Sequence, residues 1–196
     1  MKRIEVFCTV LIVAMLAFAM GCSRSASRTS DDTSLDQLTG KDIPAVGEHS
    51  PPVGATKGFT APDFAIKTID GSTVSLEQLT SQKPTLLYFW ATWCPYCKRD
   101  LAAAEKVYPE YKDKVAFLAI DLDPKETVQQ IADYQKKYGH DLIQFAAADK
   151  KVLQDYGITS TTTKIAIDWN RLILWRGSGE IDEKTWRILL DGLATS

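Results

Sequence analysis

The stretch TLLYFWATWCPYCKRD, residues 85–100, joins an unbroken apolar run to two cysteines that are separated by two residues. Such a run is typical of a central strand buried on both faces of a sheet, so we predict a strand over 85–91. Apolar residues then recur at helical spacing, which predicts a helix over 95–112. The sequence therefore places Cys94 at the N-terminus of a helix that follows a buried strand, with Cys97 one turn further on.

Strands and helices alternate on either side of this stretch. The other predicted elements are a hairpin over 63–76 around Asp70-Gly71, a strand over 115–121, a helix opened by Pro124 and running to about Tyr138, a short strand over 142–147, a short helix from Lys150 to Tyr156 ended by Gly157, a hairpin of strands 164–168 and 172–177, and a helix over 183–193. This order predicts an α/β fold: a mixed sheet with helices on both faces and a C-terminal hairpin plus helix. We find no internal repeat and no second domain.

The composition excludes one broad class of partner. The chain has 196 residues, 45% of them hydrophobic and 24% charged, which is ordinary for a globular protein that buries a core. The formal net charge is −2 and the pI is about 5.7. Because there is also no basic run with interleaved aromatic residues, we expect no binding to nucleic acid.

The N-terminus resembles an export signal. Lys2 and Arg3 precede an apolar run over 6–20, which is too short for a comfortable membrane span but typical of a signal peptide. The run ends in LAFAMGC, similar to a bacterial lipoprotein signal in which the cysteine, here Cys22, is acylated and becomes the new N-terminus. An uncleaved anchor and a simple secretory signal are the alternatives.

These features predict three parts of the chain: a lipoprotein-type signal peptide over 1–21, a flexible tether over 22–58 and a folded domain over 59–196. The tether is rich in Ser, Thr, Asp, Gly and Pro, with few residues that could build a core. We expect the domain to be attached to a bacterial membrane through the lipid on Cys22 and to face the periplasm or the cell exterior. Disulfides persist in such compartments.

Only two cysteines are then left for chemistry, since Cys8 lies in the removable segment and Cys22 carries lipid. At a helix N-terminus the free N–H groups and the dipole stabilise a thiolate, and the pKa of a cysteine can fall from about 8.5 into the range of about 3.5–7.5. Pro95 suits the first turn because it has no N–H to lose. We predict that Cys94 attacks a substrate disulfide and that Cys97 then resolves the mixed disulfide.

Other uses of the cysteine pair fit less well. A c-type haem site needs His directly after the second cysteine, where Lys98 stands. A structural zinc site needs four ligands, but there is no second CxxC, and the two histidines, His49 and His140, lie in the tether and after a predicted helix. A purely structural disulfide Cys94–Cys97 remains an alternative, although so short a loop constrains the unfolded chain little.

From about Phe59 to the C-terminus the chain resembles the TlpA/ResA-like branch of the thioredoxin superfamily. The resemblance rests on FWATWCPYC at 89–97 and on the order of the elements around it. It implies a thioredoxin fold and a membrane-tethered thiol–disulfide oxidoreductase, commonly with a reducing role. Such proteins keep the cysteines of apocytochromes or copper sites reduced.

The resemblance also implies roles for single residues. Cys94 is the nucleophile, Cys97 the resolving thiol and Trp93 an aromatic that shields the pair, although Trp93 could also be a surface aromatic that fills a groove. Asp100 matches an acid that some relatives hold near the active site, where burial would let it move protons; the alternative is a solvated acid early in a helix. We expect a protein partner to meet the surface formed by four residues: Trp93, Pro95, Tyr96 and Thr162.

Two departures from the family pattern stand out. Tyr88 occupies the position where thioredoxins place a buried Asp, and a phenol is a poor base at neutral pH, so Asp100 or water would handle protons. Thr162 stands where the fold carries a cis-proline, in the loop expected to contact substrate, and we expect the peptide between Thr161 and Thr162 to be trans, because a cis bond there costs about 3–4 kcal/mol. The change either alters substrate handling, opens the sulfurs to a metal ion or cluster, or has little effect.

The sequence as a whole predicts an exported thiol–disulfide oxidoreductase with a Cys94–Cys97 redox couple and no bound organic cofactor. Its partners would be exported protein thiols or disulfides, and a membrane or periplasmic redox protein that exchanges electrons with it. The resemblance alone favours a reductase. A metal- or Fe–S-binding module that uses both cysteines is the alternative, in which a dimer could supply four thiolates. A third hypothesis is an adaptor without turnover.

Overall fold

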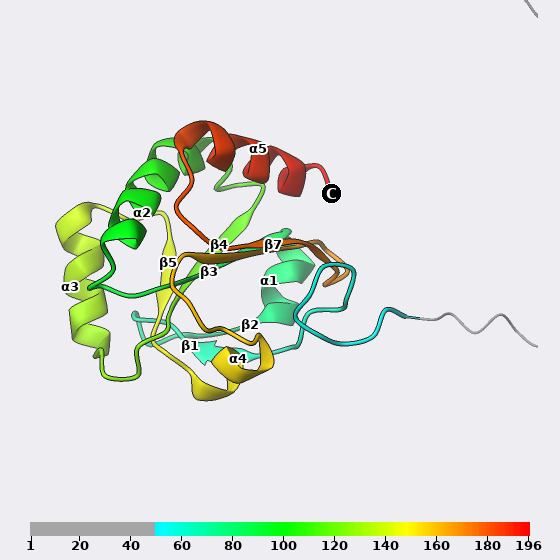
Figure 1. Ribbon diagram of the computed structural model, residues 1–196, viewed down its shortest axis with the longest axis horizontal. Coiled ribbons are helices and arrows are strands. Elements are labelled where there is room, and N and C mark those ends of the chain that lie inside the picture. The colour runs from blue at the N-terminus through cyan, green and yellow to red at the C-terminus, as the bar shows by residue number, and fades with distance from the viewer. Residues whose placement is uncertain (1–49) are drawn as a thin grey trace, which may run out of the picture. The chain divides into compact units, whose positions relative to one another are not determined.

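The computed structural model describes residues 50–196 (Figure 1). The predicted signal peptide, Cys22 and most of the predicted tether lie outside the described residues and stay predictions. No helix between residue 50 and the C-terminus is both long enough and apolar enough to cross a membrane.

A five-stranded mixed sheet forms the centre of the domain, in the order β5-β4-β3-β6-β7. Its middle strand, β3, is buried at every residue, as its apolar run predicted. The strands are β3 (Thr85–Trp90), β4 (Ala116–Asp121), β5 (Gln144–Ala146), β6 (Thr163–Ile167) and β7 (Ile173–Gly177). β3, β4 and β5 are parallel, whereas β6 is antiparallel to both β3 and β7. The predicted mixed sheet with a C-terminal hairpin is confirmed.

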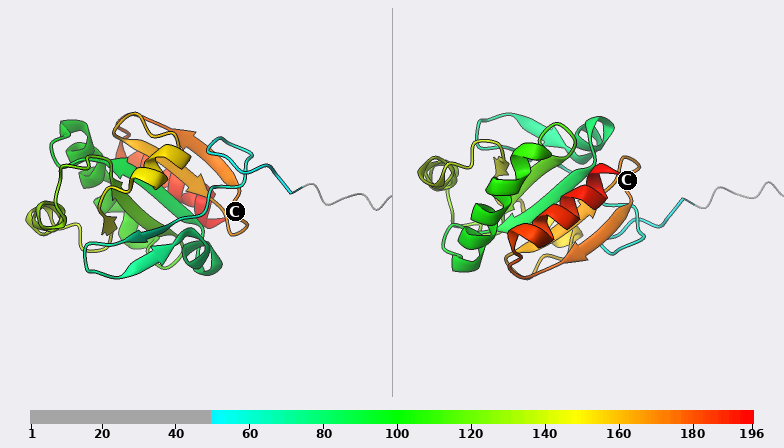
Figure 2. Two further views of the ribbon diagram at one scale, coloured as in Figure 1. Left: turned by 90° about the horizontal axis from the view of Figure 1, so that it is seen from below. Right: turned by 90° about the horizontal axis from the view of Figure 1, so that it is seen from above.

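Helices cover both faces of the sheet, and each face has its own apolar core (Figures 1 and 2). One face carries α2 (Pro95–Val107), the 3₁₀ turn η2 (Tyr108–Glu110), α3 (Val128–Tyr138) and α5 (Glu183–Ala194). The other carries α1 (Leu76–Gln82), α4 (Lys150–Asp155) and the hairpin of β1 (Ala65–Lys67) and β2 (Thr73–Ser75). Successive β3 residues alternate between the cores, with Tyr88 in the first and Phe89 in the second.

Two helix boundaries differ from the prediction. Pro124 does not open α3, because the helix begins after Thr127, whose hydroxyl accepts a hydrogen bond from Gln130 N at 3.2 Å while Gln130 Oε1 accepts from Thr127 N at 2.8 Å. This reciprocal cap stabilises the helix start more than a proline can. The predicted helix over 95–112 ends as an α-helix at Val107 and tightens into η2, because Pro109 has no N–H to continue the α-helical ladder.

The fold begins before Phe59, where the sequence placed the domain boundary. Gly58 N donates to the carbonyl of Ile173 at 2.9 Å, and Arg176 Nη1 donates to the carbonyl of Ala55 at 2.9 Å. The segment also closes on itself, since Gly54 N donates to Thr60 O at 2.9 Å. Residues 54–58, predicted as tether, therefore pack along β7 as part of the domain.

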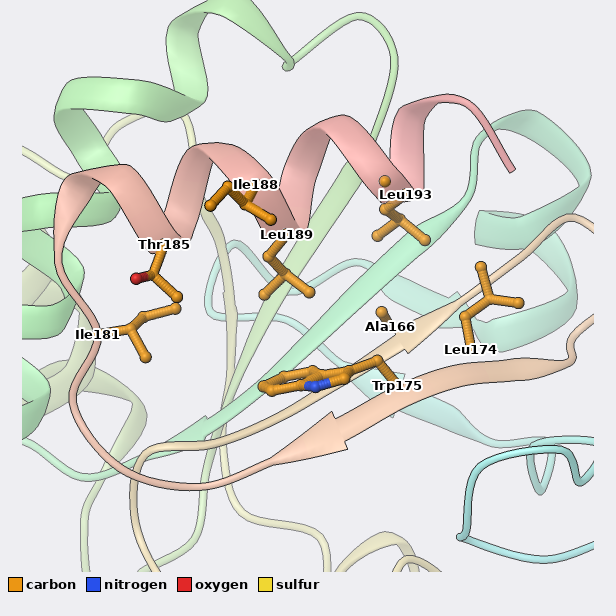
Figure 3. A pocket seen from close by; sticks show the side chains of 9 residues that line it. Ala166, Leu174, Trp175, Ile181, Thr185, Ile188, Leu189 and Leu193 are labelled. Atoms are coloured by element: carbon orange, nitrogen blue, oxygen red, sulfur yellow. The ribbon is translucent and has the colours of Figure 1, made fainter. Parts of the chain in front are cut away.

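An apolar groove of about 330 Å³ lies between α5 and the last two strands. Figure 3 shows Ile188 and Leu189 of α5 above the ring of Trp175 on β7. The lining residues are Ala166, Leu174, Trp175, Ile181, Thr185, Ile188, Leu189, Gly192 and Leu193. Neither cysteine is among them, so the groove is separate from the CxxC motif.

Candidate active site

Cys94 occupies the N-cap position of α2, as the sequence predicts. Its Sγ accepts a hydrogen bond from the backbone N of Cys97 at 3.1 Å, and Pro95 begins the helix. This is the arrangement that stabilises a thiolate at a helix N-terminus. Both cysteines are free thiols; Cys94 is 2% exposed and Cys97 is fully buried, so only Cys94 offers any surface to a substrate.

The loop that leads into Cys94 is held by the turn after β4. Thr92 donates to the carboxylate of Glu126 through its hydroxyl and through its backbone N, the latter at 3.0 Å, and Trp93 Nε1 donates to Asp123 Oδ2 at 2.9 Å. We did not single out Glu126 or Asp123 from the sequence. The available signal was that β3 and β4 are adjacent parallel strands, whose carboxyl ends meet at one edge of the sheet.

Three of the four residues of the predicted contact surface are exposed beside the nearly buried nucleophile, whereas the fourth, Thr162, is buried. Trp93 is 60% exposed and Tyr96 is 58% exposed, and Pro95 is exposed between the cysteines. The guanidinium of Arg99 lies 5.0 Å from the centre of the Tyr96 ring. The indole of Trp93 is fixed at the surface by Asp123.

Asp100 is completely buried, so the reading of it as a solvated acid is wrong. It forms an ion pair with Lys164, which is also completely buried. Its Oδ1 accepts from Ile181 N at 3.2 Å and from Trp186 Nε1 at 3.0 Å, whereas Oδ2 has the ion-pair contact but no hydrogen bond of regular geometry. Burial raises the pKa of Asp100, and the charge of Lys164 opposes this rise.

Cys97 and Tyr88 belong to the same buried region. Burial raises the pKa of the Cys97 thiol to about 12, and the sulfur of Cys94 adds to the rise. Burial also raises the pKa of the Tyr88 phenol, with further contributions from Asp100 and Cys97. The Tyr88 hydroxyl has no regular hydrogen-bond partner among residues 50–196. Its high pKa fits the expectation that Tyr88 is a poor base.

The Thr162 loop lies at the same end of the sheet as the cysteines. Phe89 pairs with Thr163, so the chain enters β6 where β3 runs out toward Cys94. Every peptide bond from residue 50 onward is trans, including the one between Thr161 and Thr162, as expected. Thr162 has φ 59°, a left-handed conformation that is costly for a β-branched residue, and its buried hydroxyl accepts from Gly179 N at 3.0 Å. Thr161 is half-buried next to it.

Lys164 is the site residue that the sequence analysis missed. It lies in β6 directly opposite Tyr88 of β3. One signal was available: a lysine inside an otherwise apolar strand in the middle of a sheet must find a buried acid, because an unpaired ammonium is too costly there. The sequence alone did not say which acid that was.

Across residues 50–196, no group of three or more His, Cys, Asp or Glu side chains is arranged to hold a metal ion. Cys94 and Cys97 by themselves would supply two of the four ligands of a tetrahedral thiolate site.

A family model described as the AhpC/TSA family matches residues 58–183. The chain belongs to the AhpC/TSA family. It is 35% identical to the thioredoxin-like protein YneN of Bacillus subtilis over 141 residues, which cover 71% of this chain and 81% of that protein. It is 32% identical to the thiol–disulfide oxidoreductase ResA of Bacillus anthracis over 127 residues, which cover 63% of this chain and 70% of that protein.

Solved structures agree on the fold. The domain resembles a putative thiol:disulfide interchange protein DsbE from Chlorobium tepidum, with a TM-score of 0.63 and 22% identity over 72% of this chain and 99% of that one. It also resembles a secreted Mycobacterium tuberculosis disulfide oxidoreductase, with a TM-score of 0.59 and 18% identity over 66% of this chain and 96% of that one. This AhpC/TSA member thus has the thioredoxin-like fold, in its ResA-like branch, and is a thiol–disulfide oxidoreductase.

Proposed function

We propose that the protein reduces disulfides of exported proteins through a dithiol–disulfide cycle at Cys94 and Cys97. The observation that carries the proposal is the position of Cys94 at the N-cap of α2, with its sulfur accepting from Cys97 N and Cys97 buried behind it. Cys94 attacks the substrate disulfide, and Cys97 displaces the reduced substrate from the mixed disulfide. The two electrons lost by the cysteine pair are those gained by the substrate disulfide.

The surroundings of Cys94 support the reducing direction. Strongly oxidising thiol–disulfide oxidoreductases have a high reduction potential because their reduced form, with its nucleophilic thiolate, is highly stabilised. Here the donors to Cys94 Sγ among the described residues are one backbone N–H and the thiol of Cys97. With so little stabilisation of the reduced form, we place the couple near the potential of thioredoxin.

The surface around Cys94 determines which substrates the protein accepts. Because Cys94 is almost buried, a substrate disulfide has to be presented on an extended segment that lies against Trp93, Pro95 and Tyr96, with the loop of Thr161 and Thr162 on the other side. Cysteines of apocytochromes or of metal sites, which are reduced before their cofactor is attached, fit this description. A membrane or periplasmic redox protein would then reduce the Cys94–Cys97 disulfide again.

The reduction potential of the couple, measured on purified full-length protein that has been checked for bound metal, tests this proposal. We expect a value near or below about −250 mV, close to the value of about −270 mV for thioredoxin. A value near about −120 mV would instead make the protein an oxidant. A pair of thiolates held by metal, with no reversible couple, would favour the metal-binding alternative.

We further propose that Cys22 is acylated and anchors the domain to a bacterial membrane, with the chain between Cys22 and the domain acting as a tether. The sequence LAFAMGC at the end of an apolar run supports this. Replacement Cys22→Ala should move the protein from the membrane fraction to the soluble fraction and abolish labelling by a fatty-acid analogue. A labelled Cys22→Ala variant would contradict the assignment.

A further inference from the structure

The buried ammonium of Lys164 has three polar contacts. Lys164 Nζ donates to the carbonyl of Gly179 at 2.8 Å and to the carbonyl of Thr162 at 3.1 Å, and it forms an ion pair with the carboxylate of Asp100. The rings of Tyr88 and Trp186 also present their faces to it, with centres 5.0 Å and 5.3 Å from Nζ. Burial lowers the pKa of Lys164 and Asp100 opposes this effect, so the contacts favour the charged form.

The ammonium lies close to the chemistry of the resolving thiol. Cys97 and Asp100 are three residues apart on α2, both fully buried, so their side chains lie on the same face of the helix. Tyr88 lies opposite Lys164 in the sheet, and both Asp100 and Cys97 raise its pKa. Cys97, Asp100, Lys164 and Tyr88 therefore share one compartment from which water is excluded, where charges interact strongly.

Every neighbour of Asp100 acts on its charge state in a definite direction. Lys164 on β6, Ile181 N and the indole N–H of Trp186 on α5 favour the carboxylate, while burial favours the acid. Tyr88 on β3 is uncharged and lowers the pKa of Asp100. Glu180, which pairs with Arg99 at the surface, raises the pKa of Lys164. Lys164 is the only cation that pairs with Asp100 in the described chain.

We propose that Lys164 is a positioning residue of the exchange reaction, because its ammonium keeps Asp100 ionised so that this carboxylate can accept the proton of the Cys97 thiol. The inference rests on the proposed dithiol–disulfide cycle and names a residue that acts in its resolving step. Among residues 50–196, Asp100 is the fully buried acid that lies one helical turn from Cys97 and has a fully buried counter-ion.

In the mixed disulfide, Cys94 Sγ is bonded to a substrate sulfur and Cys97 carries its proton. The proton passes to Asp100, the Cys97 thiolate attacks Cys94 Sγ, and the bond between Cys94 and the substrate sulfur breaks with its electron pair on the substrate. The substrate thiolate then takes up the proton from Asp100 or from solvent. Lys164 stays protonated throughout and neither gives nor receives a proton.

Two-phase kinetics with 5,5′-dithiobis(2-nitrobenzoate) test this directly on the reduced full-length protein. Attack by Cys94 releases one thionitrobenzoate, and resolution by Cys97 releases a second. We expect Lys164→Met to affect the first release much less than the second. The second release should slow at least tenfold at pH 7, because a shift of one pKa unit is a tenfold change in the ionised fraction. It should recover as the pH is raised toward 9.

The control is Lys106→Met, which removes an exposed lysine from the same helix α2, where it pairs with Glu183. It should change neither phase. An unchanged second phase in Lys164→Met would overturn the proposal. So would a loss of equal size at every pH, because a lysine that only shapes the Thr162 loop would lower the rate without moving the pH profile.

A second pair of variants covers a failure of Lys164→Met to fold. If Lys164 acts through Asp100, the second release in Asp100→Asn and in Asp100→Asn with Lys164→Met should be slower than in the wild type at pH 7 and should be equal to each other at every pH between 6 and 9. A double variant much slower than Asp100→Asn would contradict the assignment. A failure of the dithiol–disulfide cycle itself looks different, since the wild type would then release no second thionitrobenzoate, and a failure of the reducing direction alone shows only in the reduction potential.

Discussion

Asp100 and Asp121 are both fully buried, yet their surroundings differ in one essential respect. Asp100, on α2, has the ammonium of Lys164 and two N–H donors. Asp121, at the end of β4, accepts from Asp123 N at 3.0 Å through Oδ1, while its Oδ2 has no partner in the described chain. Asp121 takes part in none of the ion pairs between residues 50 and 196.

The difference shows what a counter-ion does to a buried acid. Burial raises the pKa of Asp121 to about 7, and the neighbouring acids Glu126 and Asp123 add to the rise. For Asp100 burial acts in the same direction, but a cation opposes it. A paired Asp100 fits the role that we propose for it as a base beside Cys97, whereas Asp121 stays protonated over much of the range below neutral pH.

The largest expected effect comes from making Asp100 resemble Asp121. Lys164→Met should lower the free energy of unfolding at pH 7 by about 3–5 kcal/mol, because it leaves a buried carboxylate without its partner. The loss should shrink at pH 5, where Asp100 can take up a proton and lose its charge. Urea unfolding at the two pH values measures both quantities.

Lys106→Met is again the matched control, and its exposed ion pair should contribute less than about 1 kcal/mol. If Lys164→Met cost no more than this control at pH 7, the ion pair would contribute nothing to stability, and the contrast between the two acids would disappear.

A smaller effect is expected for Asp121. Its pKa is about 7 in the folded chain against 3.8 ordinarily, so the folded state holds a proton that the unfolded state releases. The associated stability is fully present below about pH 4 and is lost as the pH rises through about 7, a change of about 2–4 kcal/mol. Asp121→Asn cannot ionise and should remove this slope, making the variant more stable than the wild type at pH 8.

Asp113→Asn, at an exposed position, serves as the control and should leave the pH dependence as it is. Unfolding free energies between pH 4 and pH 8 decide the matter. A slope that persists in Asp121→Asn would mean that some other group titrates in this range.

The fold could be predicted largely from local patterns. The apolar run of β3, the hairpin turn at Asp70-Gly71 and the cysteine pair at the start of α2 each lie within a few residues, and all three are present. The start of α3 was predicted wrongly because a capping box and an earlier proline indicate different first residues for the helix. Thr127 and Gln130 begin α3, while Pro124 lies in the turn before it.

In the candidate site, too, local features could be predicted and tertiary contacts could not. The sequence placed Cys94 at a helix N-terminus, Cys97 behind it and a non-proline residue at position 162, because each follows from residue identity and short spacing. Whether Asp100 was solvated or buried stayed open, because the exposure of a helix residue depends on what packs against it. Here Trp186 of α5 and Lys164 of β6 cover it.

The sequence by itself determined the chemistry of this protein: a strand that must be buried, a helix that must follow it and two thiols at their junction. Only the tertiary structure decided the electrostatics around those thiols. The register between β3 and β6 sets Lys164 opposite Tyr88 and beside Asp100, while Asp121 lies where no cation of residues 50–196 pairs with it. The physical reason is that the energy of a buried charge depends on distance and on exclusion of water, and both are set by segments far apart in the chain.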